Sequence, residues 1–306
     1  MKNKLYIALI ITAVFALSFA LKSLLAGGGD GEEAEHLTAG DCSRIISLAP
    51  SITETLYAIG LGEKIAGVTR FCNFPSAVKD KPRIGGYYDP NYELIASLNP
   101  SLVILLTEHR DARRRFQKLG IETLTVNHIS VEGIIESVET IGRRCGAEES
   151  AKVLLTNILA EVEDVKRRVE KLDKKRVMVI VGRYIGGGEV KDVYISGNDG
   201  FYDDVIKLAG GINVYDGKTV MMPAVSIEGI TELNPDVIID ILPDAVKEKI
   251  DESAIKAEWN GMDVKAVKEG NVHILRADYA VIPGPRFVKL LRRMAEMIHP
   301  EVGWSS

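Results

Sequence analysis

The chain has 306 residues, of which 46% are hydrophobic and 26% charged, and its formal net charge is −5 at pH 7. This length is enough for two domains of ordinary size, and the composition is typical of a globular protein. The mild acidic excess argues against a nucleic-acid-binding protein, because such a protein needs a basic face or stripe.

The first 26 residues are predicted to be a membrane segment. Lys2 and Lys4 precede an uncharged run over Leu5–Leu21, and a positive start followed by an apolar run is typical of an export signal. Counted through Ala26, the run reaches about the 20 residues that span a bilayer. No convincing small-x-small cleavage site is present, so we expect an uncleaved anchor over 1–26, with a cleaved signal as the alternative. The rest of the chain should then lie on the extracytoplasmic side.

A glycine-rich acidic tether follows over residues 27–43, and its composition cannot form a packed core. Within it, Gly29, Gly31 and Ala34 formally match the fingerprint of a dinucleotide-binding loop. We reject that function because a membrane segment precedes the match and no amphipathic helix follows it.

The N-terminal lobe is predicted over residues 44–147. Arg44–Ala49 has the pattern of a buried strand, and the capping box Ser51-x-x-Glu54 predicts a helix over Ile52–Ile59. The same alternation continues in a strand over Ile65–Val68, a helix near Ala112–Leu119 and a strand near Glu122–Val126. Strands that alternate with helices indicate an α/β lobe with a mainly parallel sheet.

One long helix is predicted over Glu148–Leu172, in a linker at 148–174, because apolar residues recur there every three or four positions without Gly or Pro. Its stripe could serve a coiled-coil dimer, but it covers only about three heptads, so we expect a monomer in which the helix packs across two lobes. The C-terminal lobe follows over 175–306, with predicted elements at Arg176–Val181, Asp203–Leu208, Val272–Leu275 and Arg286–Ile298.

A motif occurs twice in the chain, at Tyr92–Leu106 and at Ile227–Ile241, with six of fifteen positions identical. Each copy is a short amphipathic helix, an Asn-Pro turn and a run suited to a buried strand. We expect Asp89 and Ser226 to cap the two helices. The fold class predicted from this repeat is α/β, with two similar lobes of mainly parallel sheets, one long α-helix joining them and a ligand cleft between them.

The cysteines Cys42, Cys72 and Cys145 make an odd number and have no CxxC spacing. In an exported protein one pair could be oxidised, and Cys42 with Cys72 is conceivable because both lie near the ends of early strands. Three buried thiols are the alternative, and the sequence leaves both open.

Several segments together carry a family resemblance: RIISLAPSITETLYAIGLGEKIAGVT, FCNFP, GGYYDPNYELIASLNPSLVI, GFYDDVIKLAGG, VSIEGITELNPDVII, and PGPR before the last helix. Over about residues 44–299 the chain resembles the substrate-binding proteins of ABC importers in the helical-backbone class, the cobalamin and iron-siderophore group. The resemblance implies capture of a small molecule without catalysis, and permease subunits with their ATPase as partners. It also implies that one glutamate per lobe, Glu93 and Glu228, docks onto arginines of the permease. From the residues alone, each is a first-turn carboxylate that a helix dipole favours.

Loops at the carboxyl ends of the strands should line the cleft, because open α/β sheets bind ligands there. The residues predicted to bind the ligand are Pro50, Ser51, Arg70, Phe71, Tyr87 and Tyr88 in the first lobe and Arg183, Tyr184, Met222, Asp278, Tyr279 and Arg286 in the second. Flat aromatic faces suit a corrin ring or an aryl siderophore. The FCNFP and GGYYDPN segments look closer to the cobalamin branch, although Met222 stands where relatives often carry a tryptophan. We expect a corrinoid such as cobalamin, with an iron chelate (a ferric siderophore or haem) as the alternative.

Two other classes of function are not favoured. A site for a bare metal ion needs converging ligands, whereas the five histidines His36, His109, His128, His273 and His299 are scattered along the chain. An enzyme is not indicated because GxSxG, HExxH and a GxGxxG after a lobe strand are absent from the sequence. We therefore expect neither catalytic residues, nor a resident metal, nor a cofactor.

Overall fold

The computed structural model describes residues 40–304 except 199, 218–221 and 244–249. The chain from Thr38 to Ser306 forms one compact unit. The anchor predicted over 1–26 and most of the predicted tether lie outside the described residues. Within the described part of the chain, no helix is both long enough and apolar enough to cross a membrane.

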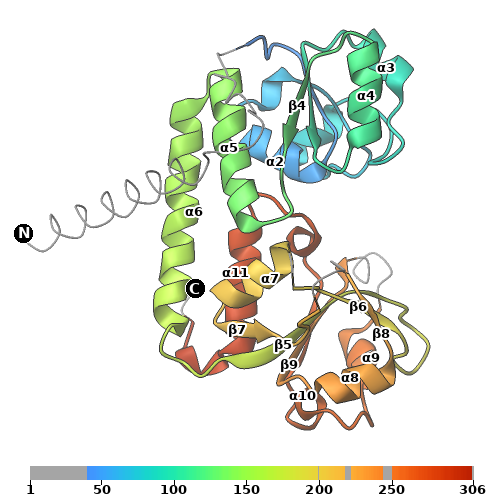
Figure 1. Cartoon of the computed structure of the whole chain (residues 1–306), viewed down its shortest axis with the longest axis vertical. Helices are drawn as coiled ribbons and strands as arrows, with labels where there is room; N and C mark the ends of the chain where they lie inside the picture. The colour runs from blue at the N-terminus through green and yellow to red at the C-terminus, as the bar shows by residue number, and fades with distance from the viewer. Residues whose placement is uncertain (1–39, 199, 218–221, 244–249, 305–306) are drawn as a thin grey trace, which may run out of the picture. The chain divides into compact units, whose positions relative to one another are not determined.

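The N-terminal lobe is built on a four-stranded parallel sheet whose strand order is β2-β1-β3-β4 (Figure 1). Its strands are β1 (Ile45–Ser47), β2 (Ile65–Val68), β3 (Leu102–Leu106) and β4 (Thr123–Val126). Its helices are α2 (Pro50–Ala58), α3 (Tyr92–Ser97), α4 (Arg110–Lys118) and α5 (Val131–Cys145), with 3-10 turns at Gly62–Lys64 and Ser76–Asp80. All five residues of β3 are buried, as its unbroken aliphatic run predicts for a central parallel strand.

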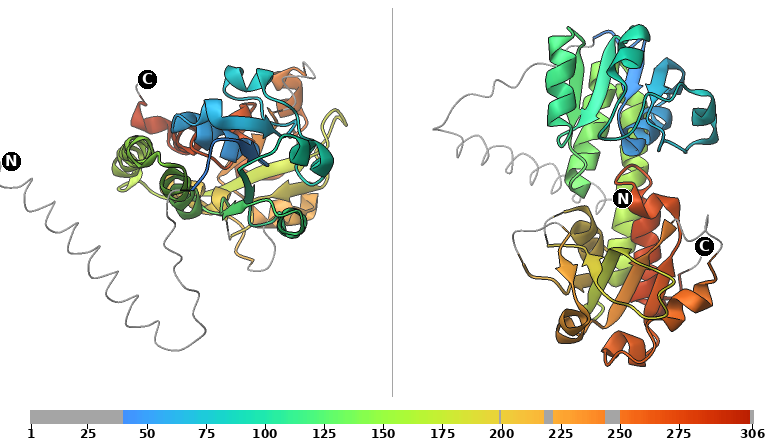
Figure 2. Two further views of the ribbon diagram at one scale, coloured as in Figure 1. Left: turned by 90° about the horizontal axis from the view of Figure 1, so that it is seen from above. Right: turned by 90° about the vertical axis from the view of Figure 1, so that its right-hand side faces the viewer.

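The long helix α6 (Glu148–Val169) confirms the predicted linker helix. It packs against α5 on the side of the first lobe and against α7 and α11 on the side of the second, as Figure 2 shows from two further directions. Ala151, Leu155, Ile158, Val165 and Val169 are its buried residues, and they belong to a hydrophobic core that continues through both lobes. The linker is therefore part of the core, not an exposed spacer.

The C-terminal lobe has a six-stranded mixed sheet of order β10-β9-β5-β6-β8, with β7 paired to β5. The β5–β6 and β6–β8 pairs are antiparallel, and the β5–β7, β5–β9 and β9–β10 pairs are parallel. The strands are β5 (Lys175–Arg183), β6 (Val193–Ile195), β7 (Gly211–Asn213), β8 (Ala224–Val225), β9 (Val237–Ile241) and β10 (Val272–Leu275). The helices are α7 (Phe201–Leu208), α8 (Ile227–Leu233), α9 (Glu252–Ala257), α10 (Lys265–Lys268) and α11 (Phe287–Ile298), with 3-10 turns at Asp278–Val281 and Pro300–Val302.

The repeated motif forms the same unit in both lobes, α3 with β3 in the first and α8 with β9 in the second. Its two turn residues, Asn99 (φ 47°) and Asn234 (φ 40°), are the only non-glycine residues of the described chain with positive φ. Asparagine is one of the few residues that tolerate this left-handed conformation, which explains why it recurs.

The helix caps of the two copies agree only in part with the prediction. Ser226 caps α8, since its side chain accepts a hydrogen bond from the backbone N–H of Gly229. The cap of α3 is Asn91 and not Asp89, because Asn91 accepts the bond from the Leu94 N–H at 3.0 Å. Asp89 forms an ion pair with Arg70 instead.

The predicted capping box in α2 is wrong, although the helix itself is present. Helix α2 begins at Pro50 with Ala49 as its N-cap and without a side-chain cap. Ser51 is hydrogen bonded to His128, and the Glu54 carboxylate accepts hydrogen bonds from Arg286. Both side chains thus have distant partners that sequence spacing does not reveal.

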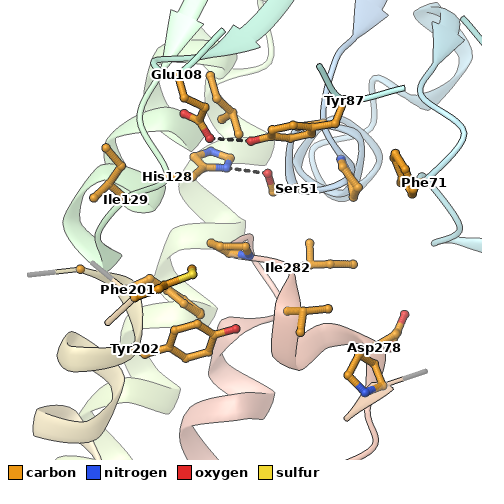
Figure 3. A pocket seen from close by; sticks show the side chains of 18 of the residues that line it. Ser51, Phe71, Tyr87, Glu108, His128, Ile129, Phe201, Tyr202, Asp278 and Ile282 are labelled. Carbon is orange, nitrogen blue, oxygen red and sulfur yellow. Dashed lines mark hydrogen bonds between the residues drawn. The ribbon is translucent and has the colours of Figure 1, made fainter. Parts of the chain in front are cut away.

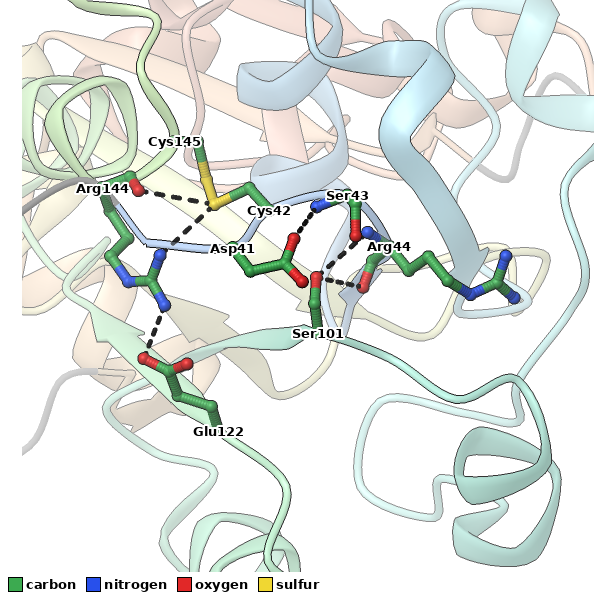
Figure 4. The surroundings of a disulfide bond; sticks show 8 residues. All are labelled: Asp41, Cys42, Ser43, Arg44, Ser101, Glu122, Arg144 and Cys145. Carbon is green, nitrogen blue, oxygen red and sulfur yellow. Dashed lines mark hydrogen bonds and ion pairs between the residues drawn. A yellow bond between two sulfur atoms is a disulfide. The ribbon is translucent and has the colours of Figure 1, made fainter.

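A disulfide joins Cys42 to Cys145, with the Cα atoms 5.4 Å apart (Figure 4). It fixes the segment before β1 to the last residue of α5. Beside it, Arg144 is buried and forms an ion pair with Glu122 at 2.5 Å. Cys72 is a buried free thiol, so both alternatives left open by the sequence, a Cys42–Cys72 bond and three free thiols, are wrong. No helix was predicted over Val131–Cys145, so nothing in the sequence placed Cys145 beside Cys42.

Candidate functional site

A cavity of about 900 Å³ lies between the two lobes (Figure 3). The first lobe lines it with residues that follow its four strands, among them Pro50, Phe71, Phe74, Tyr87, Glu108, His128 and Ile129. The second lobe lines it with the start of α7 and the loops after β9 and β10, among them Phe201, Tyr202, Pro243, Asp278, Val281 and Ile282. The carboxyl ends of parallel strands therefore meet at this cavity, where α/β sheets bind ligands.

The walls are unusually apolar for a surface open to solvent. Five large apolar residues that are 41–51% exposed line the cavity, namely Phe71, Phe74, Ile129, Met222 and Val281. The rings of Phe201 and Tyr202 face the cavity from the second lobe (Figure 3). A concave cluster of exposed apolar side chains is typical of a ligand-binding site.

A tyrosine–glutamate pair forms one polar edge of the cavity. The Tyr87 hydroxyl donates to Glu108 Oε1 at 2.5 Å (Figure 3). The Tyr87 ring also contacts the His109 ring, with centroids 4.4 Å apart. Burial, together with the bond to Glu108, raises the pKa of Tyr87. The phenol therefore stays protonated and keeps Glu108 oriented along the cavity wall.

A buried histidine supports the N-terminus of α2 at the cavity. His128 is 5% exposed, and its Nδ1 is hydrogen bonded to Ser51 Oγ at 2.8 Å and its Nε2 to Ser137 Oγ at 2.7 Å. Burial lowers the pKa of His128 to about 4, so the ring is neutral near pH 7. Because both ring nitrogens are engaged, the side chain positions Ser51 and does not offer a free metal ligand.

The charge of the lining is acidic. Among the described residues that line the cavity, the only charged side chains are Glu108 and Asp278, and neither lysine nor arginine occurs. Two of the arginines predicted to bind the ligand lie outside this lining and have acidic partners: Arg70 pairs with Asp89, and Arg286 pairs with Glu54 and with Asp278 of the lining. The described lining therefore favours ligands that donate hydrogen bonds over ligands that carry negative charge. The described residues also contain no group of three or more His, Cys, Asp or Glu side chains placed to hold a metal ion.

The structure divides the predicted binding residues into two halves. Those that line the cavity are Pro50, Ser51, Phe71, Tyr87, Met222 and Asp278. Those outside the lining are Arg70, Tyr88, Arg183, Tyr184, Tyr279 and Arg286. Tyr88 and Tyr184 are 78% and 79% exposed, and Tyr88 instead contacts the edge of the Tyr87 ring at 4.7 Å between centroids.

Arg183 lies inside the second lobe and not at the cavity. Its side chain is 1% exposed, and it binds Asp240 at 2.7 Å and Glu258 at 2.5 Å. The guanidinium also lies over the Trp259 ring, 5.5 Å from its centroid. Glu258 accepts a further hydrogen bond from the backbone N–H of Gly186, so this ion cluster holds the loop after β5. Arg183 is therefore a structural residue of the lobe.

Several lining residues were missed by the sequence analysis, and the most informative are Phe74, Glu108, His128, Ile129, Phe201 and Tyr202. Glu108 and His128 come directly after β3 and β4, so the rule that strand ends meet at the cleft could have nominated both. Phe201 and Tyr202 open α7, and no strand end precedes them directly, so that rule gives no signal for them.

The two predicted docking residues occupy equivalent exposed positions in the repeat. Glu93 and Glu228 are in the first turns of α3 and α8. Hydrogen bonds from its own backbone N–H and from Ser226 lower the pKa of Glu228. In Figure 1, α3 and α8 lie on the side of their lobes away from α6.

Comparison with known proteins agrees with this architecture. The chain matches the family described as "Periplasmic binding protein" over residues 45–279. It is 30% identical over 263 residues to the uncharacterized ABC transporter substrate-binding lipoprotein YvrC of Bacillus subtilis, covering 84% of this chain and 80% of that protein. It is 26% identical over 259 residues to the vitamin B12-binding protein of Vibrio campbellii, covering 84% and 90%.

A solved structure shares the fold. The periplasmic haem-binding protein RhuT from Roseiflexus sp. RS-1 superimposes with a TM-score of 0.72 at 22% identity, covering 85% of this chain and 99% of that one. At this identity the likeness concerns the fold alone. Together with the family match over most of the chain, these findings identify a member of the periplasmic binding protein family, a substrate-binding protein of an ABC importer.

Proposed function

We propose that this protein captures a corrinoid, such as cobalamin, in the cavity between its lobes and delivers it to the importer's permease without chemical change. The observation that supports this most is the cavity itself: about 900 Å³ in volume, aromatic on both sides, and free of lysine and arginine among the described lining residues. This volume is near the upper end of the roughly 300–1,000 Å³ that ligand pockets usually have.

The chemistry of the lining suits a corrin ring. A corrin presents two broad faces, which Phe71 and Phe74 of one lobe and Phe201 of the other can cover. Its rim carries amide groups, whose N–H bonds need acceptors. Glu108 and Asp278 suit these groups, because an ionised carboxylate accepts hydrogen bonds and does not donate them. Cobalamin is also what the printed name of the Vibrio campbellii relative says that protein binds.

An iron chelate is the second candidate. One observation favours haem: Met222 lines the cavity and is 51% exposed, so its thioether could ligate an iron. Against it, haem carries propionates and many ferric siderophores carry negative charge, and the described lining offers no cation to pair with them.

Calorimetric titration of residues 38–306 with cyanocobalamin, haemin and a ferric hydroxamate siderophore tests the ligand. We expect one-to-one binding of cyanocobalamin, weakened about 10- to 150-fold by Phe71→Ala, because burying a phenylalanine side chain contributes about 1.5–3 kcal/mol. Tyr184→Ala is the matched control, since that ring is exposed and outside the cavity. If haemin or the ferric siderophore binds and cyanocobalamin does not, the ligand is an iron chelate, the second candidate.

We further propose that Glu93 and Glu228 dock the loaded protein on the permease, on the extracytoplasmic face of the membrane, with residues 1–26 as the anchor. Two separated carboxylates set orientation and association rate more than affinity. Glu93→Ala combined with Glu228→Ala should abolish uptake in a transport assay and leave cyanocobalamin affinity unchanged. Glu132→Ala, which removes another exposed first-turn carboxylate, should leave uptake intact. Loss of ligand affinity in the double variant would contradict the docking role.

A further inference from the structure

One guanidinium connects the two lobes beside the cavity. Arg286 precedes α11 in the second lobe, and Glu54 lies in α2 of the first, with side chains 11% and 2% exposed. Arg286 Nε donates to Glu54 Oε2 at 2.9 Å, and its Nη2 donates to Oε1 at 2.6 Å. This two-pronged geometry fixes both the distance and the relative orientation of the elements it joins.

The same guanidinium contacts both walls of the cavity. It binds Asp278 through Nη1 at 3.0 Å and Nη2 at 3.1 Å, and Asp278 lines the cavity from the second lobe. It also lies over the ring of Phe74, 4.1 Å from the centroid, and Phe74 lines the cavity from the first lobe. Arg286 is thus within contact of the residues that a ligand would touch, although it does not itself line the cavity.

The backbone beside Arg286 is closely fitted to α2. A Cβ added at Gly284 would lie 3.2 Å from both Cα and Cβ of Ser51, tighter than ordinary van der Waals contact. Pro283, the preceding residue, lines the cavity. The Pro-Gly-Pro-Arg segment therefore brings the second lobe against the start of α2, and glycine is the residue that permits this approach.

A second contact between the lobes lies at the start of α5, where the Val131 N–H donates to Asp204 Oδ2 of α7 at 2.9 Å. That contact is a single hydrogen bond between a backbone group and an aspartate, and neither residue lines the cavity. The Arg286 contact differs because it is charged, bidentate and shared with the cavity walls. Arg286 therefore links Phe74 of one lobe to Asp278 of the other.

We propose that Arg286 is a positioning residue that sets the spacing of the two lobes and presents Phe74 and Asp278 to the ligand. This rests on the proposed function, in that the cavity is taken as the ligand site. A buried ion pair contributes little net stability, because desolvation of both charges offsets their attraction. Positioning is therefore the better account of a pair that is 11% and 2% exposed.

The test uses one variant that removes the pair without leaving a lone buried charge, Arg286→Met with Glu54→Gln. Spin labels at Lys118→Cys in α4 and Glu232→Cys in α8, both exposed, report the distance between the lobes by double electron–electron resonance. We expect a single narrow distance distribution for the parent protein without ligand and a broadened one for the double variant. Cyanocobalamin affinity should fall at least tenfold. Arg286→Lys keeps the charge but not the planar guanidinium. Its distance distribution and its cyanocobalamin affinity should lie between those of the parent and those of the double variant.

Arg70→Met is the matched control for the distance measurement. Arg70 also lies over a cavity-lining ring, 5.1 Å from the centroid of Phe71, but its partner Asp89 is in the same lobe. Arg70→Met should therefore leave the distance distribution between the two spin labels unchanged. An unbroadened distribution for Arg286→Met with Glu54→Gln overturns the proposal, and so does a broadened one with affinity within twofold of the parent. If the parent itself fails to bind cyanocobalamin, the corrinoid assignment fails, and the ligand-free distances still decide the role of Arg286.

Discussion

The first lobe is closed by a disulfide between Cys42 and Cys145 and contains a neutral hydrogen-bonded histidine, His128, at its cavity wall. The second lobe contains a buried ion cluster in which Arg183 binds Asp240 and Glu258, and its described residues contain no disulfide. Both lobes nevertheless carry the same helix–turn–strand unit. The repeat therefore specifies the backbone frame, and each lobe stabilises its interior by different chemistry.

The two lobes also contribute different kinds of side chain to the cavity. The tyrosine–glutamate pair and the histidine at its walls come from the first lobe, whereas the second contributes mainly apolar groups such as Phe201, Val281 and Ile282, with Asp278 as its charged residue. Two lobes that share one helix–turn–strand unit thus present different side chains to the cavity. We expect a ligand with one more polar and one less polar side to bind in a single orientation.

The largest expected effect on stability is in the second lobe. Arg183→Met should lower the free energy of unfolding by about 3–5 kcal/mol, because it leaves Asp240 and Glu258 buried without a cation. Urea unfolding followed by circular dichroism measures this. Lys191→Met, which breaks an exposed pair in the same lobe, is the control and should change stability by less than about 1 kcal/mol. A loss of less than about 1 kcal/mol in Arg183→Met, as in the control, would contradict a stabilising role of this ion cluster.

In the first lobe, Cys42→Ser with Cys145→Ser should cost about 2–4 kcal/mol, because the bond closes a loop of 103 residues and restricts the unfolded chain. The same urea experiment on this variant, and on the parent with a reducing agent, gives the value. Cys72→Ser should have a smaller effect, since Cys72 is a free thiol. Equal stability of oxidised and reduced parent protein would contradict this role of the disulfide.

The neutral histidine should make the first lobe sensitive to acid. The folded-state pKa of His128 is about 4, below the ordinary value near 6.5. The contribution of the neutral ring to the free energy of unfolding is therefore fully present above about pH 6.5 and is lost as the pH falls toward 4. At pH 4.5 the loss amounts to about 2.5 kcal/mol. His128→Gln, which can still bond to both serines, should flatten this dependence between pH 7 and 4.5. An unchanged pH profile in that variant would mean that other groups cause it.

The smallest losses of stability should come from substituting the turn asparagine that both copies of the repeat contain. Asn99→Ala and Asn234→Ala each place alanine in a left-handed conformation, at a cost of about 1 kcal/mol. The second should cost more, because Asn234 Oδ1 also accepts the backbone N–H of Lys265 at 2.9 Å. The matched variants Asn99→Gly and Asn234→Gly remove the strain and isolate that bond. Equal losses of stability in Asn99→Ala and Asn234→Ala would show that the Asn234–Lys265 hydrogen bond adds nothing measurable.

The sequence predicted the parts of the fold that depend on local pattern. The repeat, the alternation of strands and helices and the apolar spacing of α6 are all expressed within short stretches of chain, and the structure contains each of them. The Asn-Pro turn was recognisable because its conformation restricts the residue type.

The site was predicted less well because its side chains are fixed by distant partners. Glu54 resembles a helix-capping residue until Arg286, 232 positions away, is placed beside it. Arg183 sits at a strand end as a ligand-binding residue would, but two acids of the same lobe neutralise it. Such pairings are decided by tertiary packing, which a single sequence does not display.

The central claim is that a corrinoid binds between the lobes, and cobalt provides its own marker. Crystals of the protein grown with cyanocobalamin, measured at the cobalt absorption edge, would locate the metal by anomalous diffraction. We predict one strong peak inside the cavity, between the walls that carry Phe71 and Phe201. A peak elsewhere on the protein, or an empty cavity under conditions where haemin gives an iron peak there, would contradict it.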